Sequence, residues 1–402
     1  MNQILKRIKF IKFNFKKYGL VCNRYLLFML HIWFKLLGLS PWKMDTNLRI
    51  NTEIRNKGPR FHFSYVGSCY NILVFVIIVV TAGYILRNLL PFYGDHSTFT
   101  VEVLSINLKI FSMLCTSVIP LLYIVRQQLY KKILNKFETL DNKLNKCADF
   151  KTENDNINYL IFSIYIVIMC CMVILRQLYF KALVTVMLGS FPDFIVNGLI
   201  IQYAMLLNII KIRFKNVNSI LSKLGTSESR ISLSRTSVLD DIGRIKSAYV
   251  DLCEMCEDIV SFYGMPVLIE IIVISLKTIY NLYYIVLIFL DLRESENIMC
   301  LCVLLSLWYN FVFTALATNV SKIVKQNKKT AMIINLLLDR YAMDEEIKQK
   351  LTQFASDHWH LTVEFTACDI VPLDRTLLAI INGTIATYLV IAVQFRISAI
   401  PD

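Results

Sequence analysis

The last apolar stretch of this 402-residue chain carries polar side chains along one side of a helix. Thr384, Thr387, Ile391, Gln394 and Ser398 are separated by three and four residues in turn, which is the period of one helix face. Hydroxyl and amide groups in such a stripe can line a water-filled path or bond to a neighbouring helix. Repeated around a symmetry axis, Gln394 gives a polar ring and Ile391 an apolar constriction that gates by dewetting.

A second set of polar residues predicts a cavity for a small molecule. Lys277, Tyr280, Asn281 and Tyr284 share one helix face within another apolar stretch. Hydrocarbon penalises polar side chains unless they face protein or water, although the same residues can simply hold helices together. The other residues assigned to this cavity are Asn107, Gln177, Asn197, Gln202, Trp308 and Asn310, and the charged residues near them are Lys109, Arg176, Asp193 and Glu270.

Metal and catalytic motifs are weak in this sequence. Cys253-x-x-Cys256 has metal-like spacing but lacks a second pair, and His358-Trp359-His360 has no partner cluster. Both are interpreted as packed or solvated side chains. No nucleophile elbow, phosphate loop or zinc-protease signature is present. We therefore expect no enzyme activity, no bound metal and no cofactor.

The composition indicates a membrane protein. Hydrophobic residues make up 56% and charged residues only 18%, against about a quarter in soluble domains. A helix needs roughly 20 mostly apolar residues to cross a bilayer, whereas barrel strands are shorter and alternate. Seven stretches satisfy the helical criterion and predict an all-α bundle: 65–86, 101–125, 157–175, 194–212, 263–290, 298–320 and 375–397.

Charge distribution predicts the orientation of these spans. If the N-terminus is inside, the inner segments hold 35 of the 43 Lys and Arg residues. Cytoplasmic loops carry this excess, so the N-terminus is expected in the cytoplasm and the C-terminus outside. The Lys and Arg residues behind the net charge of +13 are then expected at the cytoplasmic membrane surface, where they face anionic lipid. No nucleic-acid partner is expected.

The same pattern predicts four parts of the chain. Residues 1–64 form a cytoplasmic N-terminal segment, in which 25–39 is too short and too charged to cross and is expected to be interfacial or re-entrant. Residues 65–320 form a six-helix ligand-sensing bundle whose helices extend into the cytoplasm. Residues 321–372 form cytoplasmic anchor helices, and 373–402 form the seventh, pore-lining span.

Two stretches resemble the insect gustatory receptor family, which is related to insect odorant receptors. The run TYLVIAVQF (387–395) is similar to the family's signature of Thr-Tyr, five apolar residues and Gln-Phe. The residues before it, from Phe365 through Cys368 and Asp374, resemble the family's last span. FKLLGLSPW (34–42) resembles the segment before the first span. The C-terminal match is specific, and elsewhere the agreement is architectural.

This resemblance implies a tastant-gated, non-selective cation channel in the plasma membrane of sensory neurons. Relatives are tetramers, so a homotetramer or a heteromer with related receptors is expected. Tastant binds in the outer half of each subunit, and the last helix lines the pore. By position in the motif, Ile391, Gln394 and Phe395 form the gate, with Thr387 and Thr384 farther along the pore. A bitter or otherwise aversive ligand is expected, with a sugar as the alternative.

Two other classes of membrane protein fit the sequence less well. A G-protein-coupled receptor is disfavoured because no Asp-Arg-Tyr-like triplet follows the third span and no Asn-Pro-x-x-Tyr lies in the seventh. The charge asymmetry also has the opposite direction. A transporter built from inverted halves is disfavoured because no internal repeat is visible.

Overall fold

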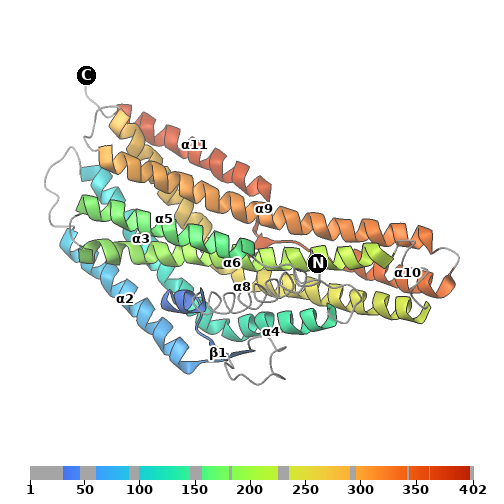
Figure 1. The fold of residues 1–402 in the computed structure, drawn as a ribbon. Coiled ribbons are helices and arrows are strands. Elements are labelled where there is room, and N and C mark those ends of the chain that lie inside the picture. The colour runs from blue at the N-terminus through green and yellow to red at the C-terminus, as the bar shows by residue number, and fades with distance from the viewer. Residues whose placement is uncertain are drawn as a thin grey trace, which may run out of the picture.

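The computed structural model describes residues 30–45, 60–89, 99–144, 156–180, 183–224, 235–289, 296–341, 344–361 and 363–398. Helices dominate these ranges, with two short antiparallel strand pairs, β1–β2 and β3–β4 (Figure 1). In chain order the elements are β1 (Lys43–Asp45), β2 (Arg60–His62), α2 (Tyr65–Leu89), α3 (Phe99–Val125), α4 (Gln127–Leu144), α5 (Asn156–Phe180), α6 (Leu183–Leu224), α8 (Arg235–Phe289), α9 (Glu296–Arg340), α10 (Glu345–His360), β3 (Thr366–Ala367), β4 (Val371–Pro372) and α11 (Arg375–Ser398).

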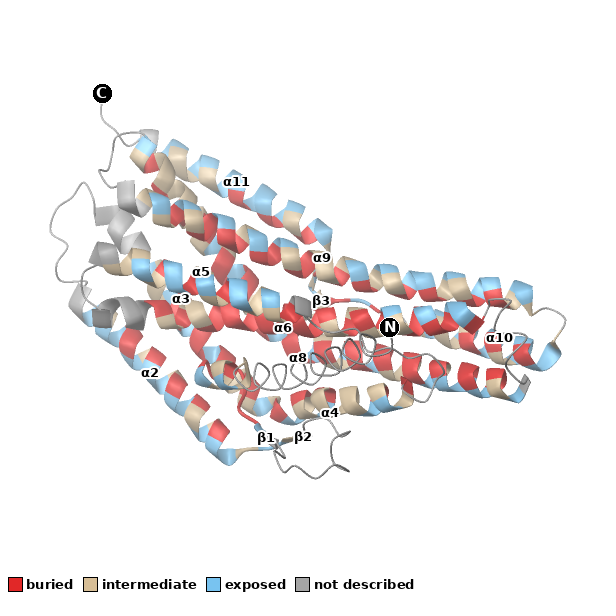
Figure 2. Cartoon of the chain, viewed as in Figure 1, coloured by how far each residue is buried: buried red, intermediate tan, exposed pale blue. Residues whose placement is uncertain are grey.

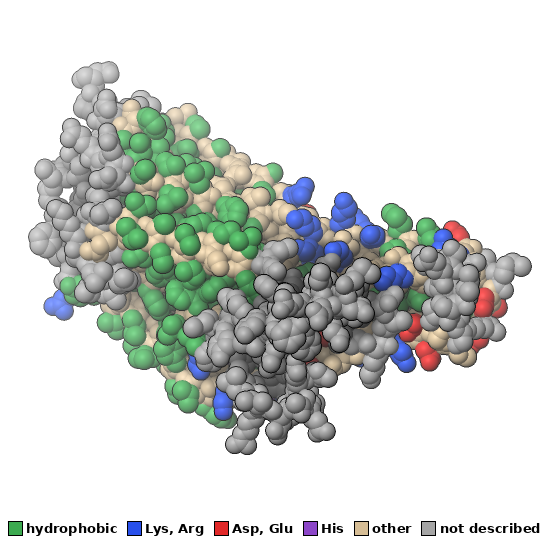
Figure 3. Space-filling view, viewed as in Figure 1, with side chains coloured by type: hydrophobic (Ala, Val, Ile, Leu, Met, Phe, Trp, Pro, Cys, Tyr) green, Lys and Arg blue, Asp and Glu red, His purple; other side chains and the backbone are tan. Residues whose placement is uncertain are grey.

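Within the described residues, seven helices are long and apolar enough to cross a membrane. They are α2, α3, α5, α6, α8, α9 and α11, which confirms the predicted all-α, seven-span architecture. Figure 3 shows apolar side chains over the half of the molecule that holds these spans. Lys and Arg gather where this apolar surface ends, and Asp and Glu appear toward the opposite tip.

Three of the spans continue far beyond a bilayer. Helices α6, α8 and α9 have 42, 55 and 45 residues. At about 1.5 Å per residue, α8 is about 80 Å long, whereas the hydrocarbon core is about 30 Å thick. The far ends of these helices pack with α4 and α10 into a second, smaller bundle (Figure 1). This extension of spans into a helical anchor region agrees with the sequence-based expectation.

Apolar packing, rather than charge, holds the second bundle together. Ile133 and Leu140 of α4 are fully buried, as are Leu351 and Phe354 of α10. Lysines of α4 also pair with acidic residues of α8, but half-exposed pairs of this kind contribute only about 0–1 kcal/mol each. The bundle is therefore a conventional apolar core with a charged surface.

The weak metal-like motifs lie in this second bundle, where the two cysteines and His358 are packed and Trp359 and His360 are exposed. Cys253 and Cys256 are buried on α8. His358 stacks on the Tyr249 ring, and its Nε2 lies 3.1 Å from the main-chain oxygen of Asn327. Among the described residues, no group of three His, Cys, Asp or Glu side chains is arranged to hold a metal ion.

Helix α6 forms the centre of the spanning bundle, and α11 lies at its edge. In α6, 89% of the most apolar window is buried inside the chain, against 17% in α11. Figure 2 shows the same contrast, with buried residues along α6 and exposed residues along α11. A spanning helix that its own chain leaves uncovered must meet lipid or another protein chain.

Residues 34–42, here called the wedge segment, enter the bundle between the spans. Gly38 ends its short helix with φ of 74°, a left-handed conformation that glycine adopts without strain. Asn71 of α2 donates from Nδ2 to the main-chain oxygens of Gly38 (2.7 Å) and of Pro120 in α3 (3.0 Å). The described part of the predicted interfacial or re-entrant helix (25–39) therefore packs inside the protein, while residues 25–29 lie outside the described residues.

Replacement of Gly67 by alanine is expected to destabilise the protein. An added Cβ would lie 1.8 Å from the main-chain oxygen of Pro41, so α2 or the wedge segment must move. Overpacking of this kind costs about 1–3 kcal/mol. Gly83 on the same helix is the matched control, since a Cβ there meets nothing within 4 Å. Thermal unfolding in detergent should show a lower Tm for Gly67→Ala than for Gly83→Ala, and equal values would contradict this docking of the wedge segment.

Candidate ligand pocket and pore helix

Three charged side chains from three helices meet in the outer half of the spanning bundle, the half nearer the end of α11. The Asp193 carboxylate on α6 accepts from Lys277 Nζ of α8 at 2.5 Å and from Arg176 Nη2 of α5 at 2.6 Å. These side chains are only 14–16% exposed. Isolated charges are strongly penalised in a membrane interior, so Asp193 is the common partner that keeps both cations there.

Hydrogen bonds extend this ion cluster to a fourth helix. Arg176 Nη1 donates to Ser190 Oγ at 2.9 Å. Asn197 Nδ2 donates to the main-chain oxygen of Asp193 at 2.7 Å, and its Oδ1 accepts from Trp308 Nε1 of α9 at 2.8 Å. The network therefore joins α5, α6, α8 and α9, so the ion cluster contributes to the packing of all four helices.

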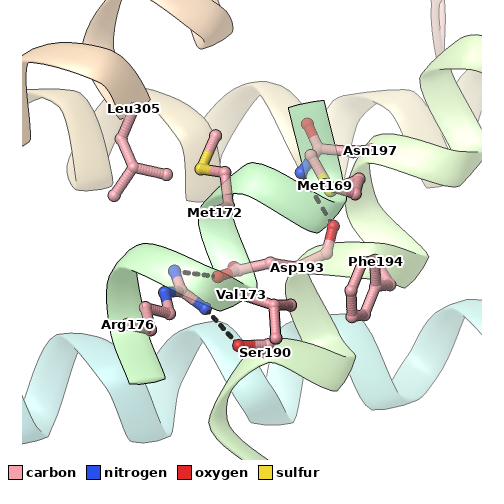
Figure 4. A pocket seen from close by; sticks show the side chains of 9 residues that line it. All are labelled: Met169, Met172, Val173, Arg176, Ser190, Asp193, Phe194, Asn197 and Leu305. Atoms are coloured by element: carbon pink, nitrogen blue, oxygen red, sulfur yellow. Dashed lines mark hydrogen bonds and ion pairs between the residues drawn. The ribbon is translucent and has the colours of Figure 1, made fainter. Parts of the chain in front are cut away.

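A small cavity lies beside the ion cluster (Figure 4). Its volume is about 10 Å³, room for roughly one water molecule. Polar and apolar groups both line it, and the apolar ones include the flexible thioethers of Met169 and Met172 (Figure 4). Such a cavity takes a larger molecule only if these side chains rotate away. The complete lining is Met169, Met172, Val173, Arg176, Ser190, Asp193, Phe194, Asn197 and Leu305.

The predicted polar stripe of α11 faces away from the rest of the chain. Ile381 and Ile385 are buried against the bundle, whereas Ile391 is 41% and Phe395 73% exposed. The hydroxyls of the stripe threonines bond to main-chain oxygens one turn earlier in the same helix. They are therefore not used to hold α11 against its own neighbours. The exposed members of the stripe are Thr384, Thr387, Ile391, Gln394 and Ser398.

A short hairpin, β3–β4, precedes α11 in the chain and packs against α8. Its turn residues Cys368 and Asp369 have φ of 54° and 57°, and Ile370 N donates to Ala367 O at 3.1 Å. The turn lies against Gly264 of α8, where a Cβ would be 3.1 Å from the Cys368 nitrogen. Asp374 then caps α11 by accepting from Thr376, and these hydrogen bonds hold the Asp374 pKa below its usual value. Backbone contact therefore links α8 to α11.

The sequence model of one family, described as 7tm chemosensory receptor, matches residues 27–399, nearly the whole chain. The chain belongs to the 7tm chemosensory receptor family. It is therefore a membrane protein of chemosensory type and not an enzyme, as the sequence predicted.

Two named relatives of this receptor are also chemosensory receptors by name. It is 26% identical to gustatory receptor 28a of Drosophila melanogaster over 189 residues, or 46% of this chain and 41% of that one. It is 27% identical to gustatory receptor 28b of the same species over 154 residues, or 36% and 32% of the two chains. The matched part thus spans less than half of either relative's length.

Solved structures of an insect olfactory receptor share the fold. OR5 from Machilis hrabei matches with a TM-score of 0.66 at 12% identity, over 93% of this receptor and 99% of that chain. OR5 in complex with eugenol matches with a TM-score of 0.61 at 14% identity, over 93% and 98%. At these identities the likeness establishes the shared architecture.

The receptor brings only some of the predicted cavity residues together. Lys277, Asn197 and Trp308 belong to the network around Asp193. Tyr280 and Tyr284 instead pack in a separate apolar cluster. Of the predicted residues, only Asn197 lines the cavity itself. The remaining candidates are not among the lining residues: Asn281 is buried on α8, Asn310 donates to Ser306 O on its own helix, Asn107 is exposed and Gln177 is half-buried.

Gln202 differs most from the sequence-based expectation. It follows Asp193 by nine residues on α6, which places it about 13 Å farther inward. Its Oε1 accepts from Tyr123 at 2.6 Å and Tyr263 at 3.2 Å, and its Nε2 donates to Leu39 O of the wedge segment at 3.0 Å. All of these groups are buried, so Gln202 anchors the wedge segment and does not line the outer cavity.

Two central residues were noted in the sequence only as charged residues near the predicted cavity, without an assigned role. Arg176 and Asp193 lie 17 positions apart in neighbouring spans and carry opposite charges. Their opposite charges could have predicted the contact. Two charged side chains in adjacent spanning helices reduce the free-energy cost of their burial in the membrane when they pair. The apolar lining gave no signal, since methionine and leucine are ordinary in any span.

Proposed function

We propose that this receptor is one subunit of a tastant-gated, non-selective cation channel whose α11 helices surround a central pore. The observation that supports this most directly is the exposed stripe of α11. A helix with a carboxamide, hydroxyls and large apolar residues on one uncovered face fits a pore wall better than a lipid contact. Ile391, Gln394 and Phe395 form the gate, and Thr387 and Thr384 line the pore below it.

The proposed orientation places the N-terminus in the cytoplasm. The band of Lys and Arg at the end of the apolar surface in Figure 3 then faces anionic lipid of the inner leaflet. Residues 1–64 are cytoplasmic, 65–320 carry the ligand-sensing bundle, 321–372 the anchor helices and 373–402 the pore helix. The location is the plasma membrane of sensory neurons, in a homotetramer or a heteromer with related receptors.

The tastant occupies the cavity beside Asp193 in the outer half of each subunit. The relatives named gustatory receptors support a taste ligand, and the eugenol complex of OR5 shows that a protein of this fold holds a small molecule. The apolar residues of the lining favour a bitter or aversive compound over a sugar, because sugars need many hydrogen-bonding partners. Since the cavity is nearly closed, ligand favours an arrangement in which its walls have moved apart.

Helix α8 carries this movement to the pore. Lys277 on α8 belongs to the ion cluster, and Gly264 on the same helix touches the hairpin that precedes α11. A shift of α8 therefore displaces the start of α11, and the outer end of that helix moves away from the pore axis. The ring of Ile391 widens, water enters and cations pass.

Imaging and recording together test this proposal. Single-particle images of the purified receptor should show four subunits with the Thr384–Gln394 face of α11 directed at the axis. Cells that lack other taste receptors should give cation current in excised patches without G proteins. A monomer in the images, or a current that requires G-protein supply, would refute the channel.

Replacement of Gly264 by alanine is expected to impair gating with a modest loss of stability. The Cβ at 3.1 Å from the Cys368 nitrogen pushes the hairpin by a few tenths of an ångström, at about 1 kcal/mol. Gly243→Ala on the same helix is the control, since a Cβ there meets nothing within 4 Å. Ligand concentration–response curves should shift for Gly264→Ala alone. Identical curves for both variants would remove the hairpin from the path.

A further inference from the structure

Helix α8 contains a proline near the inner end of its predicted span (263–290). Pro266 lies inside the helix, and a proline nitrogen has no hydrogen to donate. The main-chain oxygen of Phe262, four residues earlier, therefore lacks the donor that it would have in an unbroken α-helix. Such an oxygen is costly inside a membrane, and the missing bond makes residues 262–266, here called the joint, the part of α8 that bends most easily.

A side chain from outside α8 supplies the missing donor. Arg126, the residue between α3 and α4, donates from Nη1 to Phe262 O at 3.2 Å and from the same nitrogen to Ser261 O. An arginine at the inner end of a span usually reaches toward lipid phosphate. Here both hydrogens of Nη1 are given to main-chain oxygens of α8, and one of these is the oxygen that Pro266 leaves without a donor.

The junction of α3 and α4 holds this guanidinium in place. Arg126 N donates to Leu122 O at 3.0 Å, and Arg126 O accepts from Tyr130 N at 3.2 Å, so backbone hydrogen bonds run through the junction. The Phe262 ring packs against Tyr123 at 5.0 Å and against Tyr130 at 4.7 Å between ring centroids. Tyr123 and Tyr130 flank Arg126 in the chain, so the same junction contacts both the ring and the main-chain oxygen of Phe262.

The joint separates two halves of α8 that pack in different bundles. The half before it lies in the second bundle, where Ile259 is fully buried. The half after it carries Lys277 of the ion cluster, eleven residues or about 16 Å beyond Pro266. The hairpin that precedes α11 touches the joint itself, since Met265 Sδ is 3.7 Å from Cys368 Sγ. A bend at the joint therefore changes the position of the hairpin relative to the ion cluster.

We propose that Arg126 is a positioning residue for gating, which replaces the donor that Pro266 lacks and holds the joint in the arrangement described here. In that arrangement the cavity beside Asp193 has room for roughly one water molecule. Entry of a ligand bends α8 at the joint and lengthens the bond from Arg126 to Phe262 O. This inference rests on the proposed function in one respect, namely that α8 carries the movement of the cavity to α11.

Amide hydrogen exchange on the purified full chain tests the role of Arg126 without ligand or current. Arg126→Met should accelerate exchange within residues 261–270 by about 10- to 100-fold, as expected for loss of hydrogen bonds from a charged donor. Pro266→Ala returns an N–H to the helix, so Phe262 O no longer needs Arg126. In the Pro266→Ala background, Arg126→Met should therefore have little effect on exchange in this segment.

Lys132→Met is the matched control for this experiment. Lys132 is another cation of α4 that bonds to α8, through the Asp258 carboxylate at 3.0 Å, and its loss removes only a half-exposed ion pair. Exchange within 261–270 should stay at the parent rate. Equal acceleration by Arg126→Met in both backgrounds, or none in either, would overturn the inference. If Arg126→Met alone does not accumulate, its recovery by Pro266→Ala supports the inference and continued loss contradicts it.

Basal currents test the link to gating and separate it from the channel proposal. Arg126→Met should raise the ligand-free cation current about tenfold, and the double variant with Pro266→Ala should return to the parent level. No current from any variant, Ile391→Ser included, would refute the channel, whereas exchange still decides whether Arg126 replaces the missing donor. Ligand-gated current in the parent, with no change of basal current in Arg126→Met, would refute the gating role of Arg126 and leave the channel intact.

Discussion

Cells that express Ile391→Ser are expected to carry a basal cation current about tenfold or more above the parent receptor, with no ligand added. Ile391 is exposed on α11 in the single chain and would meet its copies at the pore axis. Burial of an isoleucine side chain contributes about 1.5–3 kcal/mol, and loss of about 1.4 kcal/mol shifts an equilibrium tenfold. A serine also wets the constriction and removes the dewetting barrier. Whole-cell recording measures the effect.

Val390→Ser is the matched control for this experiment. Val390 is also exposed on α11, at 53%, but lies one position off the polar stripe. Its replacement should leave the current dependent on ligand. Surface labelling must show equal amounts of each variant. The gate assignment fails if Ile391→Ser stays silent without ligand, or if Val390→Ser conducts equally.

Replacement of Asp193 by asparagine is expected to destabilise the receptor by about 3–5 kcal/mol, the largest stability effect predicted here. The change removes the charge that, among the residues the structure describes, pairs with both Arg176 and Lys277, and it leaves these two buried cations without that partner. Asparagine has nearly the same shape, so packing is conserved and the loss is electrostatic. Thermal unfolding in detergent and the amount of receptor at the cell surface should both fall sharply.

Two further variants separate charge from shape. Asp193→Glu keeps the charge and should recover most of the stability. The triple variant Asp193→Leu, Arg176→Met and Lys277→Met removes all three charges and should be more stable than Asp193→Asn, because apolar replacement of a buried ion cluster is often neutral or favourable. An Asp193→Asn protein as stable as the parent would show that these cations are solvated.

Much of the architecture was predictable because the bilayer imposes local rules. Each spanning helix satisfies its own backbone hydrogen bonds, so its length and composition are visible in its own residues. The seven spans follow from the length and composition of the apolar stretches, and the polar stripe of α11 follows from residue spacing. Ile391 and Gln394 of this stripe are exposed in the structure, as the spacing predicts. The family was also foreseen, since its signature is one continuous run, 387–395.

The pocket was less predictable, because it is made by pairs of residues distant in sequence. The face shared by Lys277 and Tyr284 on one helix did not say which neighbour each would meet, and the two lie in different clusters. Gln202 was assigned to the cavity as a polar residue in the outer half of its span, but its side chain bonds to three buried groups farther inward. Polarity within a span predicts that a partner exists, and only the packing of helices selects it.

The sequence by itself determined the seven helices, their expected orientation and the polar side of the last one, since these depend on period, length and charge. Only the tertiary structure decided that Asp193 joins Arg176 and Lys277, that the wedge segment enters the bundle, and that a hairpin touches α8 before α11 begins. The physical reason is the range of the interactions. Helix formation depends on residues within a few turns of one another, whereas the ion pairs and hydrogen bonds of the tertiary structure join residues as far as 163 positions apart in the chain.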